Sequence, residues 1–380
     1  MIRVLLISEI PTPYRMPAFE RVAAHPNIDL HVLFCAEEEP DRPWEIESDY
    51  EFSYEVLPGV APTWRTRRDT FVYELNPSIL RVLRKSPHDV LVVSGYSVFA
   101  EQVALLWARA TGRPYVLLSE SHLGKNRSSW TQAVKQAVLP RVLRHAAAGL
   151  ATGSAAAAYL SHYGIPPGRI RIFPNTIDVA AYRDAADAAR NQRQEVLAQR
   201  GLPDRFVLYV GRLVERKGVL DLLGAHAALP VEAPPLVVVG DGPLRDAIDL
   251  YPRARALGFV APRELPQLYG LADLVVVPSH DEPWGVAVNE ALAAGAPVVV
   301  SNAVGAGLDL VQPGRNGLTY EAGDVGGLIE ALNTGLAHFR SPVSGGRIDH
   351  WDYDFATDQF VQAMALAVAS PVAAHLEDRH

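Results

Sequence analysis

The stretch Phe206-Val-Leu-Tyr-Val-Gly-Arg-Leu-Val-Glu-Arg-Lys-Gly218 is an apolar strand pattern that runs into a loop carrying Arg212 and Lys217. A second stretch, Glu282-Pro-Trp-Gly-Val-Ala-Val-Asn-Glu290, follows another apolar strand and opens an apolar helix. Short apolar runs that alternate with helical patterns are typical of parallel α/β sheets. Two cations and two carboxylates at strand ends suit a ligand with sugar hydroxyls at one end and a diphosphate in the middle. We therefore predict a sugar nucleotide site.

The two stretches resemble the donor site of the retaining family 4 glycosyltransferases, which combines a Glu-x7-Glu element with an Arg-x4-Lys loop. The resemblance covers nearly the whole chain, because further strings similar to those of the family occur in the family's order. They are Pro11-Thr-Pro-Tyr-Arg15, Pro174-Asn-Thr-Ile-Asp178, Val239-Gly-Asp-Gly-Pro243 and Gly258-Phe-Val260. The resemblance implies the GT-B fold, with two Rossmann-like doubly wound domains facing an interdomain cleft.

The length of 380 residues and the 49% hydrophobic content fit two domains with full cores. We predict an acceptor-binding domain over residues 1–175, a donor-binding domain over 176–350, and a final segment 351–380. The resemblance implies that the helix of this final segment crosses back to the first domain. The predicted strands are Ile2 to Ser8, Asp29 to Phe34, Tyr54 to Leu57, Val90 to Ser94, Tyr115 to Ser119, Gly149 to Thr152, Arg171 to Phe173, Phe206 to Val210, Leu236 to Val239, Leu274 to Val277 and Val298 to Ser301.

The donor site needs fixed positive charge, because a diphosphate leaving group gains negative charge as the glycosidic bond breaks. Arg212 can bind it as a planar fork and Lys217 as a point charge. A helix that begins near Trp284, Gly285 or Val286 would add backbone N–H groups. The resemblance implies that Glu282 contacts a donor sugar hydroxyl and Glu290 the ribose, while Gly240 and Val260 lie near the nucleotide.

The first domain offers residues for the acceptor and for catalysis. The resemblance implies a His close to the reacting sugar, and His122, directly after the strand ending at Ser119, is the matching residue. With Glu282, Arg212 and Lys217 it forms our predicted catalytic set. For acceptor binding we predict Tyr14, Arg15, Glu120, Lys125 and Arg127, with simple loop packing as the alternative for the first two. The family's usual Gly-Gly turn after the first strand is absent.

Charge and composition limit the classes of partner that we expect. The net charge is −8, yet residues 56–175 hold 15 Lys or Arg against 5 Asp or Glu. This basic stretch predicts a solvated face, with contact to anionic lipid or an anionic acceptor as the alternative. A pI near 5.8 and the lack of a nucleic-acid-binding motif in the sequence argue against a nucleic-acid partner. The lone Cys35 excludes an internal disulfide, and we expect neither a metal site nor a cofactor. We expect a cytoplasmic protein, with peripheral contact at the inner membrane face as the open alternative.

The predicted activity is that of a metal-independent hexosyltransferase, and the resemblance implies that it retains the configuration at the anomeric carbon. It would move a sugar from a UDP- or GDP-sugar to a hydroxyl of a glycan, glycolipid or small-molecule acceptor. For retention we favour same-face substitution in which the leaving diphosphate helps to deprotonate the acceptor. Two alternatives remain open from the sequence: a GT-B-like sugar nucleotide epimerase, and a non-catalytic sugar nucleotide binder.

Overall fold

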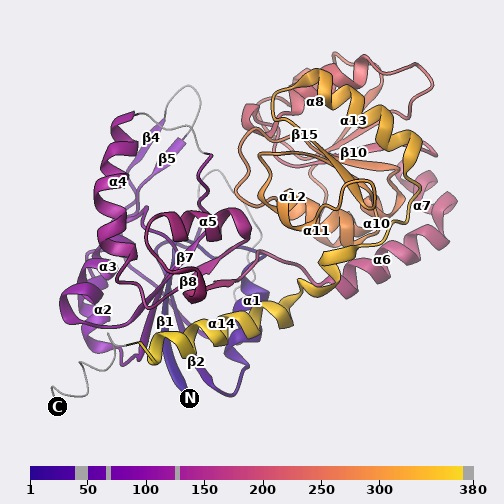
Figure 1. Ribbon diagram of the computed structural model, residues 1–380. Coiled ribbons are helices and arrows are strands. Elements are labelled where there is room, and N and C mark those ends of the chain that lie inside the picture. Colours follow the sequence, from indigo (N-terminus) through magenta and orange to yellow (C-terminus); the bar gives the residue numbers. More distant parts are fainter. Residues whose placement is uncertain (39–49, 66–69, 125–128, 371–380) are drawn as a thin grey trace. The chain divides into compact units, whose positions relative to one another are not determined.

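A computed structural model describes residues 1–38, 50–65, 70–124 and 129–370. The chain divides into two compact units (Figure 1). Unit 1 comprises Met1–Thr176 and Tyr353–His380, and unit 2 comprises Ile177–Asp352. The predicted divisions after residues 175 and 350 differ from these by one and two residues. Each unit is a parallel sheet with helices on both faces, so the predicted pair of Rossmann-like α/β domains is confirmed.

Unit 1 holds a seven-stranded parallel sheet in the order β3-β2-β1-β6-β7-β8-β9. Its strands are β1 (Ile2–Ser8), β2 (Ile28–Phe34), β3 (Ser53–Val56), β6 (Val90–Val93), β7 (Tyr115–Ser119), β8 (Ala148–Ala151) and β9 (Ile170–Ile172). A separate antiparallel hairpin joins β4 (Thr63–Arg65) to β5 (Thr70–Val72). The helices are α1 (Met16–Ala23), α2 (Ile79–Lys85), α3 (Phe99–Thr111), α4 (Ser129–Leu143), α5 (Ser154–His162), η1 (Pro167–Arg169) and α14 (Tyr353–Val368).

The helix α14 returns from the end of the chain to complete unit 1 (Figure 1). Phe360 and Met364 have no exposed surface and join the core that also contains Phe19 of α1 and the inward residues of β1 and β6. The Phe360 ring lies 5.5 Å from that of Phe173, centroid to centroid. Burying a large side chain is worth about 1.5–3 kcal/mol, so these residues are sufficient to fix the helix on the sheet.

Unit 2 holds a six-stranded parallel sheet in the order β12-β11-β10-β13-β14-β15. Its strands are β10 (Val207–Val210), β11 (Leu236–Val239), β12 (Ala254–Gly258), β13 (Leu274–Val277), β14 (Val298–Ser301) and β15 (Gly317–Tyr320). The helices are α6 (Val179–Asn191), α7 (Arg193–Arg200), η2 (Glu215–Lys217), α8 (Val219–Ala227), α9 (Arg245–Ile248), η3 (Pro262–Glu264), α10 (Leu265–Leu271), α11 (Val286–Ala293), α12 (Gly305–Leu310), α13 (Val325–His338) and η4 (Gly346–His350).

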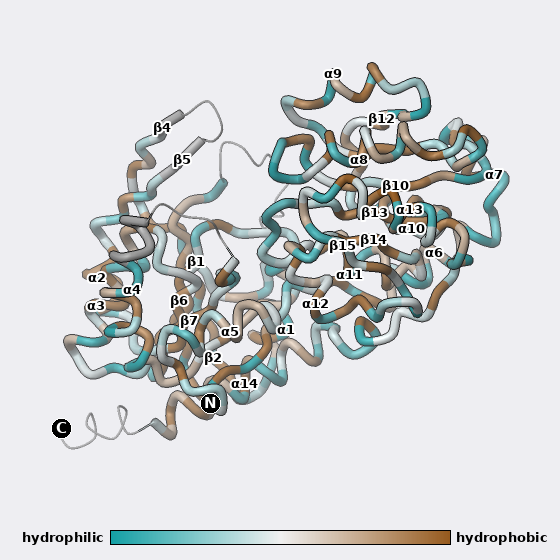
Figure 2. Tube along the Cα trace, turned by 45° about the horizontal axis from the view of Figure 1, so that its top comes forward, coloured by the Kyte–Doolittle hydropathy of each residue, from teal (hydrophilic) through white to brown (hydrophobic). Residues whose placement is uncertain are grey.

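The strands of unit 2 are apolar on both faces because both faces are covered by helices. In β11, Val237 and Val239 enter one core cluster, and Leu236 and Val238 enter the cluster on the opposite face. Figure 2 shows the same concentration of hydrophobic residues along the strands. This continuous apolar character makes such strands easy to predict from sequence.

Three differences from the predicted elements involve weaker patterns. The edge strands β12 and β15 and the hairpin β4–β5 were not predicted. The charged, Ala-rich pattern from Asp184 to Arg200 predicts one helix, whereas the structure has two, α6 and α7, which meet at Gln192. Edge strands pair on one side only and include exposed positions such as Arg255, so they lack the continuous apolar run of the central strands.

Candidate functional site

The switch point of the sheet in unit 2 brings the predicted donor residues to one place. β10 pairs in parallel with β11 on one side and with β13 on the other. Strands β10 to β12 are therefore added toward one edge of the sheet and strands β13 to β15 toward the other, so the strand order reverses between β10 and β13. Ligands of open α/β sheets bind at this point, outside the carboxyl ends of the strands. Arg212 and Lys217 follow β10, and Glu282 follows β13. The loops that carry the predicted cations and the first predicted carboxylate thus flank the switch point.

Lys217 and Glu282 form an ion pair across this point. The Lys217 ammonium donates a hydrogen bond to Glu282 Oε2, and the two side chains are only 19% and 13% exposed. Ser279 Oγ lies 3.4 Å from the same oxygen. An ammonium carries three N–H donors, so this bond leaves Lys217 with two donors for a phosphate. The pair therefore places a positive and a negative group side by side.

Gly218 allows the cationic loop to reach the end of β13. Its φ is +68°, and a Cβ atom there would lie 2.0 Å from the Pro278 carbonyl oxygen. Any other residue would be strained in conformation and would also clash with backbone. The 3₁₀ helix η2, which ends at Lys217, can therefore lie against the strand that leads to Glu282.

We expect Gly218→Ala to destabilise the protein by about 2–4 kcal/mol, because it combines an unfavourable φ with a backbone clash. The measurement is urea unfolding of both proteins. Gly224→Ala is the matched control, since Gly224 lies within α8 at a position where an added Cβ atom would meet nothing within 4 Å beyond its own helix. That change should be neutral or stabilise by up to about 1 kcal/mol. Equal effects of the two substitutions would contradict this explanation for Gly218.

Arg212 is exposed, and across the described ranges no hydrogen bond or ion pair engages its guanidinium. Its backbone oxygen accepts a hydrogen bond from the hydroxyl of the buried Tyr209 at 2.9 Å. Gly240 lies beside this loop: its φ is +128°, and a Cβ there would be 2.0 Å from Gly211 O. Gly240 N also donates to Gly258 O at 2.8 Å. The carboxyl ends of β10, β11 and β12 thus lie close together, with the half-buried Val260 two residues beyond β12.

The segment from Glu282 to Val286 is held by its backbone. Gly305 N donates to Glu282 O at 3.0 Å, and Ala306 N donates to Trp284 O at 2.8 Å. Gly285, with φ +95°, is the N-cap of α11, which begins at Val286. The Trp284 side chain is 2% exposed and stacks on Trp351 with 5.6 Å between ring centroids. Its indole therefore belongs to the core. Only the backbone of Trp284 is left to contact the predicted sugar nucleotide.

Glu290 is the fifth residue of α11, and two tyrosines bond its carboxylate. Tyr182 OH donates to Oε1 at 2.8 Å, and Tyr269 OH donates to Oε2 at 2.7 Å. Burial raises the pKa of the Glu290 carboxyl, and the two hydroxyl hydrogen bonds oppose this shift because they stabilise the ionised form. Burial also raises the pKa of the Tyr269 phenol well above its usual value. Neither tyrosine was predicted from the sequence.

In unit 1, two predicted acceptor-binding residues bond each other. The Arg15 guanidinium donates to Glu120 Oε1, and Arg15 Nε donates to Asn175 Oδ1 at 3.1 Å. Asn175 Nδ2 donates to the same Glu120 oxygen at 2.9 Å. Arg15 is 7% exposed, so its guanidinium mainly joins the loop after β1 to those after β7 and β9. This favours the packing alternative for Arg15, whereas Glu120 keeps about a third of its side-chain surface exposed.

Two other predicted residues of unit 1, Tyr14 and His122, lie in the loops that follow β1 and β7. Tyr14 and His122 are half-buried, and His122 follows β7 by three residues. Lys125 and Arg127 lie outside the described residues. The switch point of this sheet lies between β1 and β6, which pair with each other. A carboxyl group there was not predicted: Glu101 of α3 has no exposed surface and accepts hydrogen bonds from Ser97 N and Ser94 Oγ.

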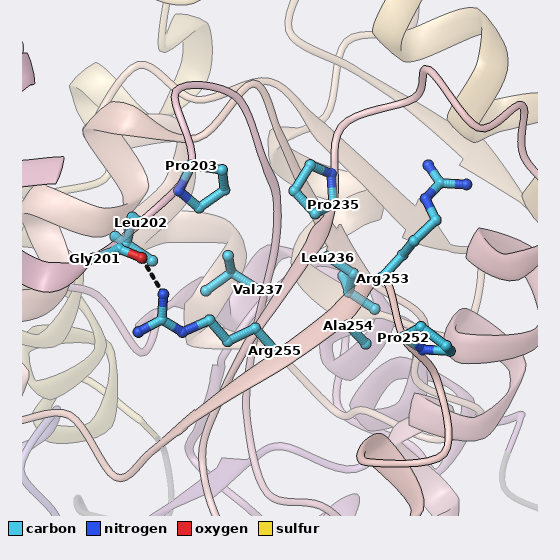
Figure 3. Close-up of a pocket in the computed structure, with 10 residues that line it drawn as sticks. All are labelled: Gly201, Leu202, Pro203, Pro235, Leu236, Val237, Pro252, Arg253, Ala254 and Arg255. Carbon is cyan, nitrogen blue, oxygen red and sulfur yellow. Dashed lines mark hydrogen bonds between the residues drawn. The ribbon is translucent and has the colours of Figure 1, made fainter. Parts of the chain in front are cut away.

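A pocket of about 370 Å³ lies at the opposite end of the sheet of unit 2, near the amino ends of β11 and β12 (Figure 3). Two arginines line it, and both donate to backbone carbonyls. Arg253 bonds Leu229 O and Ala233 O, and Arg255 bonds Gly201 O. Because ligands of such sheets bind at the carboxyl ends, this pocket is a weaker candidate for the predicted donor site than the switch point.

Membrane-spanning helices and metal-binding clusters are both absent from the described parts of the chain. No helix there combines the length and apolar character needed to cross a bilayer. No group of three or more His, Cys, Asp or Glu side chains in those residues is placed to hold a metal ion.

Known proteins resemble both halves of the chain. Residues 24–176 match the family described as glycosyl transferase 4-like domain, and residues 204–338 match glycosyl transferases group 1. Both halves of the chain match glycosyltransferase domain families. Among solved structures, the chain is similar to Anabaena Alr3699/HepE in complex with UDP and glucose, with a TM-score of 0.71 and 21% sequence identity. The match covers 96% of this chain and 100% of that one. The fold is that of the GT-B glycosyltransferases.

Among curated relatives, a GDP-mannose-dependent alpha-mannosyltransferase of Mycobacterium tuberculosis is 32% identical over 253 residues, which are 65% of this chain and 64% of the relative. A D-inositol 3-phosphate glycosyltransferase of Salinispora arenicola is 32% identical over 243 residues, 57% and 53% of the two chains. A glycogen synthase of M. tuberculosis is 36% identical over 172 residues, 43% and 41%. The match thus spans about half the length of these relatives.

Proposed function

We propose that the protein is a glycosyltransferase that moves a sugar from a UDP- or GDP-sugar to a hydroxyl of an acceptor. The observation that carries this proposal is the contact of Lys217 with Glu282 at the switch point of unit 2. A cation and a carboxylate side by side suit a donor whose charged diphosphate adjoins a hydroxyl-rich sugar. Two of the proteins named above support this proposal: the mannosyltransferase is GDP-mannose-dependent, and Anabaena HepE was crystallised with UDP and glucose.

In this proposal unit 2 binds the donor. Arg212 and Lys217 bind the diphosphate, and Glu282 accepts a hydrogen bond from a sugar hydroxyl. The N–H groups at Gly285 and Val286 face the phosphate, since a helix N-terminus is favourable for an anion. The ribose lies at Glu290 and the base near Gly240 and Val260. The two cations supply the positive charge that the leaving group needs, so the reaction proceeds without a metal ion or cofactor.

Unit 1 binds the acceptor in this proposal, with His122 closest to the reacting sugar and Tyr14 and Glu120 as further contacts. The transfer retains the anomeric configuration, and the leaving diphosphate takes the proton of the acceptor hydroxyl. Catalysis then comes from positioning and from stabilisation of the leaving group. A glycan or glycolipid is the first choice of acceptor, given the basic stretch in residues 56–175.

The test is a screen by thermal unfolding against UDP, GDP, UDP-glucose and GDP-mannose, followed by assay of nucleoside diphosphate release. A ligand that binds only the native state at 100 times its Kd adds about 2.7 kcal/mol of stability. For a unit of this size we expect the Tm to rise by about 5–10 °C. Acceptor-dependent release with the best donor would support transfer. Conversion of the donor without an acceptor would instead indicate an epimerase, and binding without turnover would indicate a non-catalytic binder.

A further inference from the structure

The carboxylate of Glu290 is held from two sides by helices that are distant in sequence. Tyr182 comes from α6, 108 residues earlier in the chain, and Tyr269 comes from α10. Each tyrosine donates to a different carboxylate oxygen. The two bonds therefore fix both the position of the carboxyl group and its rotation about the side-chain axis.

Local structure brings each tyrosine to this place. Asp178 caps α6 by accepting a hydrogen bond from Ala181 N at 2.9 Å, which fixes the start of the helix just before Tyr182. Gly270 follows Tyr269 directly, and a Cβ on Gly270 would lie 2.7 Å from Ala186 Cβ of α6. The missing side chain thus lets α10 approach α6 closely. Tyr269 has no exposed surface, so its hydroxyl has little freedom to turn elsewhere.

The carboxylate keeps unused acceptor sites, and Glu290 is only partly buried. Each oxygen of an ionised carboxylate has two lone pairs, and one tyrosine hydroxyl occupies one of them. One acceptor site therefore remains on each oxygen, and the two sites are fixed relative to each other. Two adjacent hydroxyl groups, as in a vicinal diol, match this arrangement.

We propose that Tyr182 and Tyr269 are positioning residues that hold Glu290 to accept both ribose hydroxyls of the donor, so that the site prefers ribonucleotides to 2′-deoxyribonucleotides. This proposal rests on the proposed function. The physical reason is that a site built to hydrogen-bond a hydroxyl leaves a buried group unpaired when that hydroxyl is missing. A carboxylate free to rotate could follow the one remaining hydroxyl and would discriminate less.

The test is calorimetric titration of the full chain with UDP and 2′-deoxy-UDP, and with GDP and 2′-deoxy-GDP. The wild type should bind the better ribonucleotide about 10- to 100-fold more tightly than its deoxy counterpart, the range expected for a hydrogen bond to a charged group. Tyr182→Phe and Tyr269→Phe should each reduce this ratio by about 3- to 10-fold. Glu290→Gln should reduce it at least as far. The affinity for the deoxynucleotide should change less than 3-fold in the tyrosine variants.

Tyr115→Phe is the matched control, because Tyr115 is a buried tyrosine of unit 1 whose hydroxyl donates to Val142 O. It should lower the Tm and leave the ratio unchanged. A ratio equal to that of the wild type in folded Tyr182→Phe and Tyr269→Phe would overturn the proposal. Equal binding of ribo- and deoxynucleotides by the wild type would overturn the proposal for the tyrosines and leave the proposed function standing. Failure of all four nucleotides to bind would overturn both the proposal for the tyrosines and the proposed function. Tyr182 is only partly buried, so its variant keeps the test decisive should Tyr269→Phe fail to fold.

Discussion

Replacing Lys217 with alanine is expected to reduce turnover of the nucleotide sugar by about 100- to 1000-fold, the usual loss when a group that stabilises transition-state charge is removed. Two effects combine. The leaving diphosphate loses its point charge, and Glu282, whose side chain is 13% exposed, loses the ammonium that compensates its own charge. The measurement is release of nucleoside diphosphate from the donor identified in the screen, with and without acceptor.

The partner substitution Glu282→Gln separates the roles of the pair. It keeps the shape of the side chain and removes the charge, so Lys217 is left free to bind phosphate. We expect binding of the nucleoside diphosphate alone to be unchanged or tighter, and turnover to be lower by about 10- to 100-fold because a hydrogen bond from the sugar to a charged acceptor is lost. A non-catalytic binder would show no functional loss in this variant.

Arg205→Ala is the control for both substitutions. Arg205 also forms an ion pair, with Asp273 at 3.1 Å, but it lies before the amino end of β10 and is 55% exposed. A surface pair of this kind contributes about 0–1 kcal/mol, so turnover should stay within about 2-fold of the wild type. If Lys217→Ala behaved like Arg205→Ala while both proteins remained folded, the switch point of unit 2 would not be the donor site.

The sequence was sufficient to predict the central strands and to predict that Lys217 and Glu282 lie close together. Both residues stand a few positions after continuous apolar runs, and parallel strands place their carboxyl ends at one edge. Such placement needs no knowledge of how the helices pack. The position of Gly240 follows in the same way from its place directly after β11. Its backbone lies against that of Gly211 in the loop after β10.

The surroundings of Glu290 and Arg15 depended on contacts that local patterns do not encode. Tyr182 reaches Glu290 because α6 packs against α10 and α11, and that packing depends on small residues such as Gly270. Arg15 and Glu120 were both predicted to contact an acceptor, yet they lie 105 residues apart in sequence and bond each other. A charged residue at a strand end can serve a ligand or another loop, and only the assembled loops decide between the two.

Glu101 was missed because a single carboxylate near the start of an apolar helix is an ordinary helix-start residue. In the fold it is fully buried at the switch point of unit 1. Burial raises the pKa of its carboxyl to about 8, with a smaller contribution from Glu9, while hydrogen bonds from Ser97 N, Val98 N and Ser94 Oγ oppose the shift. This pKa makes Glu101 a strong source of pH-dependent stability.

We expect the stability of unit 1 to fall as the pH rises from about 5 to above 8, because the buried carboxyl must ionise. The folded-state pKa lies above the unfolded value of 4.5, so the stabilising contribution of the protonated form is complete below pH 4.5 and is lost as the pH rises through about 8. The shift corresponds to at most about 5 kcal/mol, at 1.36 kcal/mol per pKa unit. Glu101→Gln removes the ionisation and keeps an oxygen that can accept the Ser97 hydrogen bond. At pH 8.5 the variant should therefore be more stable than the wild type by several kcal/mol, and at pH 5 the two should be nearly equal.

The measurement is urea unfolding at pH 5 and pH 8.5, with amide hydrogen exchange used to follow unit 1 separately from unit 2. Glu51→Gln, which changes an exposed carboxylate of the same unit, is the matched control and should alter the unfolding free energy by less than about 0.5 kcal/mol at either pH. Amides of unit 2 should respond equally in the wild type and in Glu101→Gln, because the ionising group belongs to the core of unit 1. A Glu101→Gln protein that is less stable than the wild type at both pH values would mean that the ionised carboxylate is stabilised by its backbone donors more than burial penalises it.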